Sequence, residues 1–220
     1  MAVDGAQVRL IDIDTGRAAW APLQHPQAVD LADLSPDGRW LVTIAQRTLR
    51  VFDAATGQQQ GSSLELESTP LQAEWAAAAP VLMLVHGMHD GTRFVERLRR
   101  VDLLNLDQPA HALDLPHLVN VIRVDPQGRY ALATEYMRPQ IHRLDFVGSG
   151  GCGALDLSDI NQIGDLGLSA DGTQAWAHLS LGRRRAALLH WDLQSCVHRV
   201  LAEEEHIGYG AVLLPLGDQV

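Results

Sequence analysis

The chain has 220 residues, of which 46% are hydrophobic, and a formal net charge of −10. This composition suits a globular domain with an apolar core, and the negative charge argues against the basic surface that nucleic-acid binding requires. All 17 basic residues are arginine, which excludes from this segment a phosphate-loop ATPase, a protein kinase and Schiff-base chemistry, because each needs a lysine.

No segment of the sequence predicts export or membrane insertion. The first ten residues, MAVDGAQVRL, lack the basic region and apolar stretch of a signal peptide. The longest apolar run, 76–85, is shorter than the roughly 18 residues that a membrane helix needs. We therefore expect a cytoplasmic protein without a membrane partner.

Two short motifs recur along the chain. The first is an apolar residue followed by aspartate, and its aspartates lie 41, 49, 43 and 47 residues apart: Asp12, Asp53, Asp102, Asp145 and Asp192. The second is a turn between apolar segments, with weaker copies at 78–80 and 216–218 and clear ones at Ser35-Pro36-Asp37-Gly38, Asp125-Pro126-Gln127-Gly128 and Ser169-Ala170-Asp171-Gly172. A period of about 45 residues in both series indicates a repeat protein.

Each repeat predicts four short strands. In the first complete repeat, apolar or alternating segments at 29–34, 39–45, 48–53 and 59–66 are separated by turn residues. The pattern predicts one all-β domain over residues 1–220, a β-propeller of four-stranded antiparallel blades. The expected blades are 7–26 (partial), 27–66, 67–115, 116–157, 158–202 and 206–220 (partial).

The partial blades at both ends do not close a ring by themselves. We expect about four complete blades that belong to a larger, commonly seven-bladed propeller, because open blades leave strand edges unpaired. The alternative is a five-bladed ring in which the two ends share one blade.

The segments 34–39 and 49–57 resemble the repeats of the bacterial WD-repeat propeller family, and Trp191-Asp192 matches the dipeptide that names the family. In that family a histidine before the inner strand joins a network with a hydroxyl, an aspartate and the tryptophan. The resemblance implies that Thr43 supplies a hydroxyl and that three histidines hold the network position: His25, His117 and His206. Its bacterial members are sensory or scaffold domains of larger signalling proteins.

The resemblance implies a non-catalytic scaffold that binds a protein or peptide. The contacting face of such a propeller is formed by the loops that enter inner strands and by the hairpins between second and third strands. This topology gives seven candidate binding residues: His25, Arg47, His89, His117, Arg138, Arg183 and His206. We expect no cofactor and no metal ion.

The alternative function is a propeller enzyme of hydrolase, lactonase or quinoprotein type, with its site at the mouth of the channel. Such a site needs carboxylate, histidine or asparagine side chains that converge from different blades. Candidates on the expected inner strands are Asp30, Asp33, Glu74, Asn120 and Asp165. They do not recur at one depth along those strands, so we expect no catalytic residues.

Two further groups of residues invite a chemical interpretation. The run 86–91 contains two histidines and an aspartate, but metal sites need more converging ligands, so we expect a polar hairpin loop. Cys152 and Cys196 are 44 residues apart, about one repeat. Equivalent outer positions on adjacent blades should lie beyond the roughly 7 Å limit between Cα atoms for a disulfide, which predicts two free thiols.

Overall fold

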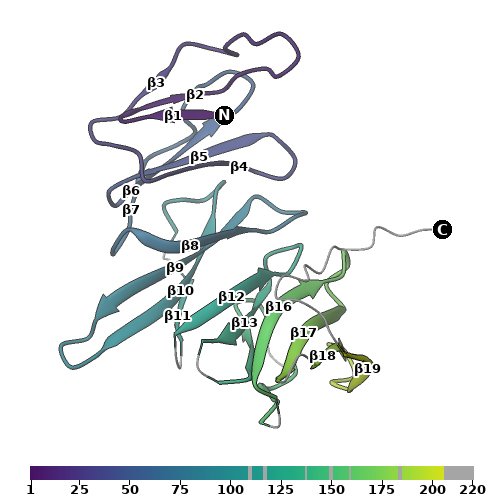
Figure 1. The fold of residues 1–220 in the computed structure, drawn as a ribbon. Coiled ribbons are helices and arrows are strands. Elements are labelled where there is room, and N and C mark those ends of the chain that lie inside the picture. Colours follow the sequence, from purple (N-terminus) through teal and green to yellow (C-terminus); the bar gives the residue numbers. More distant parts are fainter. Residues whose placement is uncertain are drawn as a thin grey trace. The chain divides into compact units, whose positions relative to one another are not determined.

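The computed structural model describes residues 1–108, 111–115, 118–136, 138–148, 151–158, 160–182 and 185–205. In this part of the chain every regular element is a β-strand, and no helix is present that could span a membrane. The strands form five antiparallel sheets in chain order (Figure 1). The predicted fold class, antiparallel propeller blades, is confirmed. The chain divides into two compact units, residues 1–112 and 113–220, and each is described by itself.

The first unit holds three sheets. Sheet A consists of β1 (Ala2–Asp4), β2 (Gln7–Arg9) and β3 (Leu23–Gln24). Sheet C consists of β4 (Leu31–Leu34), β5 (Trp40–Ala45), β6 (Thr48–Asp53) and β7 (Leu64–Glu65). Sheet D consists of β8 (Pro70–Trp75), β9 (Val81–His89), β10 (Phe94–Asp102) and β11 (His111–Asp114), and the boundary between the units falls within β11.

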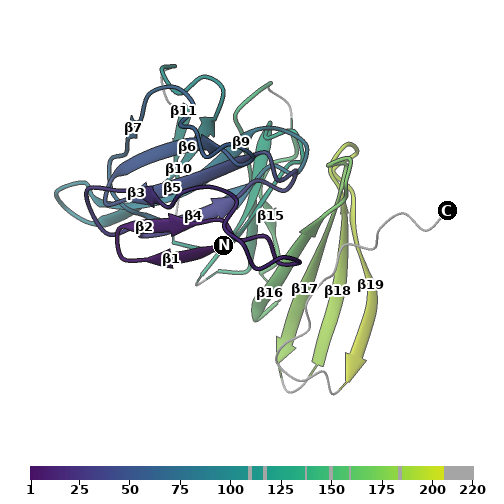
Figure 2. The ribbon, with the colours of Figure 1, turned by 90° about the horizontal axis from the view of Figure 1, so that it is seen from above.

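The second unit holds two sheets of four strands. Sheet E consists of β12 (Val119–Val124), β13 (Tyr130–Glu135), β14 (Gln140–Asp145) and β15 (Leu155–Asp156). Sheet F consists of β16 (Gln162–Leu168), β17 (Gln174–Gly182), β18 (Arg185–Asp192) and β19 (His198–Glu205). Figure 2 shows the four strands of sheet F side by side in chain order. The final partial blade expected at 206–220 lies outside the described residues.

Sheet A begins with β1, ahead of the partial blade expected over 7–26. β1 pairs antiparallel with β2, with Val3 opposite Val8. The pairing of β2 with β3 has the same register as the pairing of β6 with β7 one repeat later. In sheet A, Gln7 and Val8 pair with Gln24 and Leu23. In sheet C, Thr48 and Leu49 pair with Glu65 and Leu64.

The repeated aspartates close the turn after the third strand of a blade. The Asp53 carboxylate accepts hydrogen bonds from the Thr56 backbone N–H and hydroxyl, both at 2.8 Å. Asp192 accepts the backbone N–H groups of Gln194 and Ser195 at 2.9 and 2.8 Å. These donors favour the ionised carboxylate, and they lower the pKa of Asp192 to about 2. The aspartate recurs because this turn needs an acceptor there.

The second motif closes the turn between the first and second strands. The Ser35 hydroxyl donates to Asp37 at 2.6 Å and accepts the Trp40 backbone N–H at 2.9 Å. Gly38 follows with φ of 71°, a left-handed conformation that glycine adopts without steric cost. Local hydrogen bonds therefore produce both sequence repeats.

Alternating apolar residues of adjacent sheets form the core of each unit. Between sheets C and D, buried side chains pack in one cluster that includes Val42, Ile44, Leu82, Leu84 and Val101. Between sheets E and F, the corresponding cluster includes Leu132, Ile141, Ala177, Leu189 and Trp191. β5 is buried along its whole length, and its alternate residues pack on opposite faces: Val42 and Ile44 lie in the cluster between sheets C and D, whereas Leu41 packs with Val8 and Phe52.

The prediction of two free thiols is wrong, because Cys152 and Cys196 form a disulfide with Cα atoms 5.3 Å apart. Their positions in the two blades are not equivalent. Nine residues, 146–154, connect β14 to β15, whereas five, 193–197, connect β18 to β19. The longer connection carries Cys152 across to the turn of the next blade, where it meets Cys196.

Candidate interaction surface

Four of the seven predicted binding residues lie in the described part of the chain. Arg47 lies in the β5–β6 hairpin, His89 ends β9, and Arg138 lies between β13 and β14, and all three are exposed. His25 precedes β4 and is 7% exposed. The other three, His117, Arg183 and His206, lie outside the described residues.

His25 belongs to the packing of the first unit. Its ring meets Phe52 edge to face, with centroids 6.1 Å apart. Burial lowers the pKa of its imidazole, and the Arg50 guanidinium adds to the shift. Neither the His25 Nε2 nor the Thr43 hydroxyl has a hydrogen-bond partner among the described residues, so the network implied by the resemblance does not form there.

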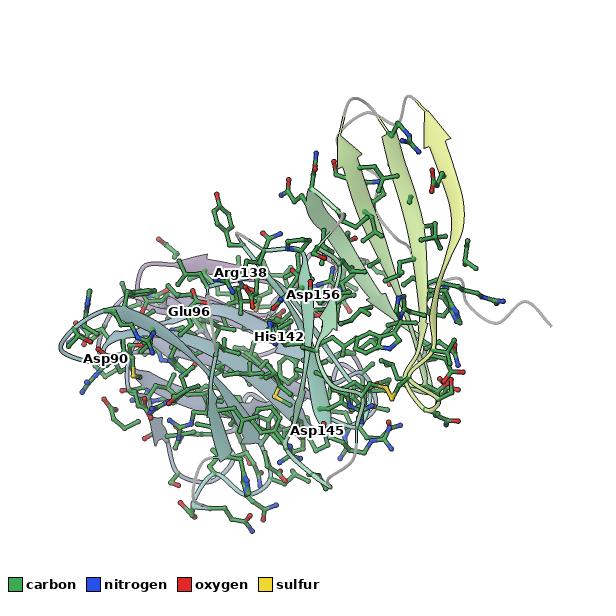
Figure 3. The ribbon with its side chains drawn as sticks, turned by 90° about the horizontal axis from the view of Figure 1, so that it is seen from below. Asp90, Glu96, Arg138, His142, Asp145 and Asp156 are labelled. Atoms are coloured by element: carbon green, nitrogen blue, oxygen red, sulfur yellow. A yellow bond between two sulfur atoms is a disulfide. The ribbon has the colours of Figure 1, made fainter. Side chains whose placement is uncertain are left out.

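Residues 86–89 are strand, not the hairpin loop expected over 86–91. β9 and β10 pair over nine positions, from Val81 opposite Asp102 to His89 opposite Phe94. The tip beyond them is closed by Asp90, which accepts the backbone N–H groups of Thr92 and Arg93 at 2.9 and 3.0 Å. Figure 3 shows Asp90 at the free end of this hairpin.

The three candidate metal ligands of this segment do not converge. His86 is buried, and its Nδ1 lies 3.0 Å from the Ser68 carbonyl oxygen. His89 is exposed and packs against Phe94, while the Asp90 carboxylate is held by its own turn. Among the described residues, no group of three histidine, cysteine or acidic side chains could hold a metal ion.

An exposed apolar cluster lies on sheet D beside the hairpin tip. Phe94 and Leu71 are 43% and 56% exposed, and the His89 ring contacts Phe94 with centroids 5.6 Å apart. A Cβ atom placed on Gly87 would lie 2.3 Å from Phe94 Cζ and 3.0 Å from Leu71 Cδ1. The glycine therefore allows the Phe94 ring to lie flat over the strand. We call Leu71, Gly87, His89 and Phe94 the hairpin surface.

An ion pair lies on the face of sheet D opposite the Phe94 ring, because Phe94 and Arg97 are three residues apart along the regular strand β10. The Arg97 guanidinium pairs with the Glu67 carboxylate at 3.1 Å, and both groups are partly exposed. Arg47, a predicted contact residue, pairs with Glu65 at 3.3 Å and reaches the Glu67 carbonyl oxygen at 3.5 Å. Glu67 lies in the connection between sheets C and D, where it contacts Arg47 of the β5–β6 hairpin and Arg97 of β10.

Two buried cationic or titratable groups lie behind this charged region. Arg99 is 7% exposed and His86 is 1% exposed. Burial lowers the pKa of both groups, and the Glu67 carboxylate partly opposes the shift. The Nδ1 contact to Ser68 is the larger opposing influence for His86. Their burial makes them structural supports of the surface and not contact residues.

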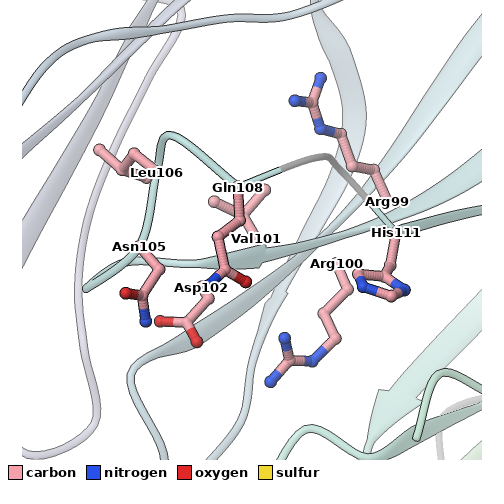
Figure 4. Close-up of a pocket in the computed structure, with 8 residues that line it drawn as sticks. All are labelled: Arg99, Arg100, Val101, Asp102, Asn105, Leu106, Gln108 and His111. Atoms are coloured by element: carbon pink, nitrogen blue, oxygen red, sulfur yellow. The ribbon is translucent and has the colours of Figure 1, made fainter.

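The described cavities of the first unit are small. One, of about 30 Å³, lies along β10 and the connection to β11 and has room for a water molecule. Figure 4 shows its lining residues: Arg99, Arg100, Val101, Asp102, Asn105, Leu106, Gln108 and His111. A groove of about 310 Å³ lies between the 35–40 turn and the 76–80 turn, at the lower size limit of small-molecule sites.

The inner-strand carboxylates considered for catalysis have structural partners. Asp30 accepts the Gln46 backbone N–H at 2.6 Å, and Asp33 accepts the Trp75 indole N–H at 2.9 Å. Asp165 pairs with Arg123 at 2.8 Å. In the first unit these bonds tie strands together, and in the second they tie sheet E to sheet F.

The sequence did not single out Phe94 and Leu71, although a signal was present. Gly87 and Phe94 flank the Asp90-Gly91 turn at opposite strands of one hairpin. A glycine inside a strand and an aromatic residue two positions from its partner, on the same face of the paired strand, indicate that the ring covers the glycine. The prediction of a loop over 86–91 hid that pattern.

The five antiparallel sheets define a chain of the β-propeller class, with an exposed apolar cluster on sheet D. No family model matches it. A similar curated protein is "Centriole proteome protein 16" of Chlamydomonas reinhardtii, 30% identical over 135 residues that cover 56% of this chain and 6% of that protein.

Among solved structures, the chain is similar to hydrazine synthase of Kuenenia stuttgartiensis, with a TM-score of 0.55 and 9% identity over 89% of this chain and 60% of that chain. At this identity the likeness concerns the fold alone. The chain spans less than two thirds of the length of either protein.

Proposed function

We propose that this chain is a non-catalytic binding module of the WD-repeat kind, which holds a protein or peptide partner at the hairpin surface. The observation that carries the proposal is the exposed pair Phe94 and Leu71, fixed side by side on sheet D over Gly87. Binding energy at protein interfaces concentrates in a few aromatic and other large side chains near the centre of the contact.

The family and the parent protein are part of the same proposal. Membership of the bacterial WD-repeat family is supported by the two turn motifs and by Trp191-Asp192. A sensory or scaffold role within a larger signalling protein follows from that resemblance. The disulfide bears on the compartment, because such bonds are typical of oxidising surroundings, whereas the sequence predicts the cytoplasm.

The absence of catalysis is likewise proposed. Its support is that Asp30, Asp33 and Asp165 each bind a neighbouring strand or sheet. A carboxylate held in this way is not placed for proton transfer to a substrate. We therefore assign the inner-strand acidic residues to the structure of the blades.

Selection of a random-peptide phage library on the immobilised chain tests the proposed surface. Selected peptides should bind the wild type and lose affinity by about 30-fold on Phe94→Ser, since removal of an aromatic anchor costs about 2 kcal/mol. Leu71→Ser should weaken the same peptides. Gly87→Ala should also weaken them, because its methyl group displaces the Phe94 ring.

The matched control is Val147→Ser, which removes another exposed apolar side chain, 58% exposed, from the second unit. This variant should bind the selected peptides like the wild type. Peptides that bind Phe94→Ser and the wild type equally would place the binding surface elsewhere. A library that yields no specific peptide would count against a peptide-binding function.

A further inference from the structure

We infer that the Cys152–Cys196 disulfide is a reversible thiol-exchange site, opened from Cys196, that fixes or releases the connection 146–154 of sheet E. The bond joins this connection to the turn between β18 and β19 of sheet F (Figure 3). The inference concerns the second unit alone and does not depend on the proposed partner of the hairpin surface.

The two sulfur positions differ in accessibility. Cys196 lies in an exposed turn with φ of 61°, whereas Cys152 is 6% exposed and packs into the core between sheets E and F. The Cys152 Sγ lies 3.3 Å from the Leu193 carbonyl oxygen. A dissolved thiol therefore reaches the Cys196 side of the bond first, because access decides which sulfur is attacked.

The exchange is a substitution at sulfur that balances without another reactant. The thiolate of a small thiol, such as glutathione, attacks Cys196 Sγ and forms a mixed disulfide there. The Cys152–Cys196 bond breaks, and Cys152 Sγ leaves with the electron pair and takes a proton from water. A second thiol attacks the mixed disulfide and releases Cys196, so one disulfide of the small thiol forms as this pair gains two electrons and two protons.

Other described contacts lie beside the bond between sheets E and F. Arg143 packs closely under Gly151, with its Nε 2.2 Å from the position of an added Cβ, and donates to the Leu193 carbonyl oxygen at 3.2 Å. Opening the disulfide leaves this packing and the buried Cys152 side chain as described links between the connection and the next blade.

The exchange couples the surface of the second unit to the redox state of its compartment. In an oxidising compartment the bond holds the connection across the two sheets. In a reducing one the connection is released while the apolar core between sheets E and F remains. A cytoplasmic chain would then hold the open form and respond to oxidation by closing.

Mass spectrometry on the complete oxidised chain tests where exchange begins. Brief treatment with reduced glutathione, followed by acid quenching and digestion, should place glutathione on the peptide that contains Cys196. Oxidised glutathione should restore the disulfide. Hydrogen exchange in peptides of 146–154 should rise on reduction and fall on reoxidation, while peptides of 54–63 in sheet C should not change.

Two single variants provide a second measurement. Cys152→Ser leaves Cys196 free, and Cys196→Ser leaves Cys152 free, so the first should react with Ellman's reagent at least about tenfold faster than the second. Glutathione found first on Cys152, or an unchanged exchange rate in 146–154 after reduction, would overturn the inference. Two free thiols in chain equilibrated with oxidised glutathione would also overturn it, and these tests on the wild type need no variant to fold.

Discussion

Sheets C and D of the first unit are joined like sheets E and F of the second, except at the outer edge. Each pair shares an apolar core. Near the inner strands, Asp33 accepts the Trp75 indole N–H at 2.9 Å in one pair, and Asp165 pairs with Arg123 at 2.8 Å in the other. At the outer connections, the Ser62 hydroxyl donates to Asp107 at 2.7 Å in the first unit, where the second has its disulfide.

The place of the outer link and the kind of bond that forms it have separate causes. In both units a longer connection before the outer strand, 54–63 or 146–154, meets the turn of the next blade. The repeat fixes that meeting point, and the residue that occupies it determines the strength of the link. An exposed hydrogen bond contributes at most about 1 kcal/mol, whereas a disulfide restricts the unfolded chain and contributes several kcal/mol.

Removing the outer link should therefore affect the two units very differently. The double variant Cys152→Ser with Cys196→Ser should lower the free energy of unfolding of the second unit by about 4 kcal/mol, the loop-entropy value for a separation of 44 residues. Native-state hydrogen exchange of peptides from β12–β19 in a urea series measures the change. Peptides from β4–β10 report on the first unit in the same sample.

The matched variant is Ser62→Ala, which removes the outer link of the first unit. It should lower the stability of peptides from β4–β10 by about 1 kcal/mol or less. Equal losses in the two units would show that the disulfide adds no more than the hydrogen bond does, and the contrast between the outer links would fail.

The features that sequence predicts here are those that local chemistry produces. Asp53 and Asp192 cap turns with hydrogen bonds that reach only two or three residues along the chain. Gly38 supplies a left-handed conformation at a fixed place in another turn. Such requirements leave a periodic record in the sequence, and the blades follow from it.

The features that sequence did not predict depend on neighbours distant in the chain. The disulfide depends on a difference in length between the connections 146–154 and 193–197. The exposure of a side chain also depends on distant neighbours. The position of His25 in the sequence suggests a surface loop, but its ring packs against Phe52. Phe94 is apolar and precedes a strand-like segment, yet Gly87 leaves its ring on the surface.

The inner links should show a smaller difference than the outer ones. Asp165 is 17% exposed at its side chain, so Asp165→Ala leaves the Arg123 guanidinium without this carboxylate in a partly buried place. A loss of about 2 kcal/mol in the second unit is expected. Asp33→Ala removes the acceptor of the Trp75 indole at an exposed carboxylate, and about 1 kcal/mol is expected in the first unit.

Urea unfolding of each variant, followed by hydrogen exchange of the two units, compares these inner links. Asp14→Ala, a change at an exposed aspartate of sheet A, is the control for a general effect of lost negative charge. A larger loss for Asp33→Ala than for Asp165→Ala would contradict the ranking. It would mean that the indole bond of the first unit is the stronger inner link.

The smallest expected effect is the loss of stability in acid at the aspartate turns, which occur in both units. The turn donors lower the pKa of Asp192 to about 2 from 3.8, and they lower the pKa of Asp53 as well. A carboxyl whose pKa is lower in the folded chain stabilises that chain above about pH 4, and this contribution disappears as the pH falls through the folded value. The second unit should therefore lose stability between about pH 4 and pH 2 partly through Asp192.

Asp192→Asn isolates this contribution, because the amide keeps an acceptor oxygen but cannot titrate. The difference in urea midpoint between wild type and variant should be constant above pH 5 and should shrink towards pH 2. Asp53→Asn should produce the same behaviour in the first unit. A difference that does not change with pH would show that the charge of the turn aspartate is unimportant, and that its lone pairs alone explain its recurrence in the blades.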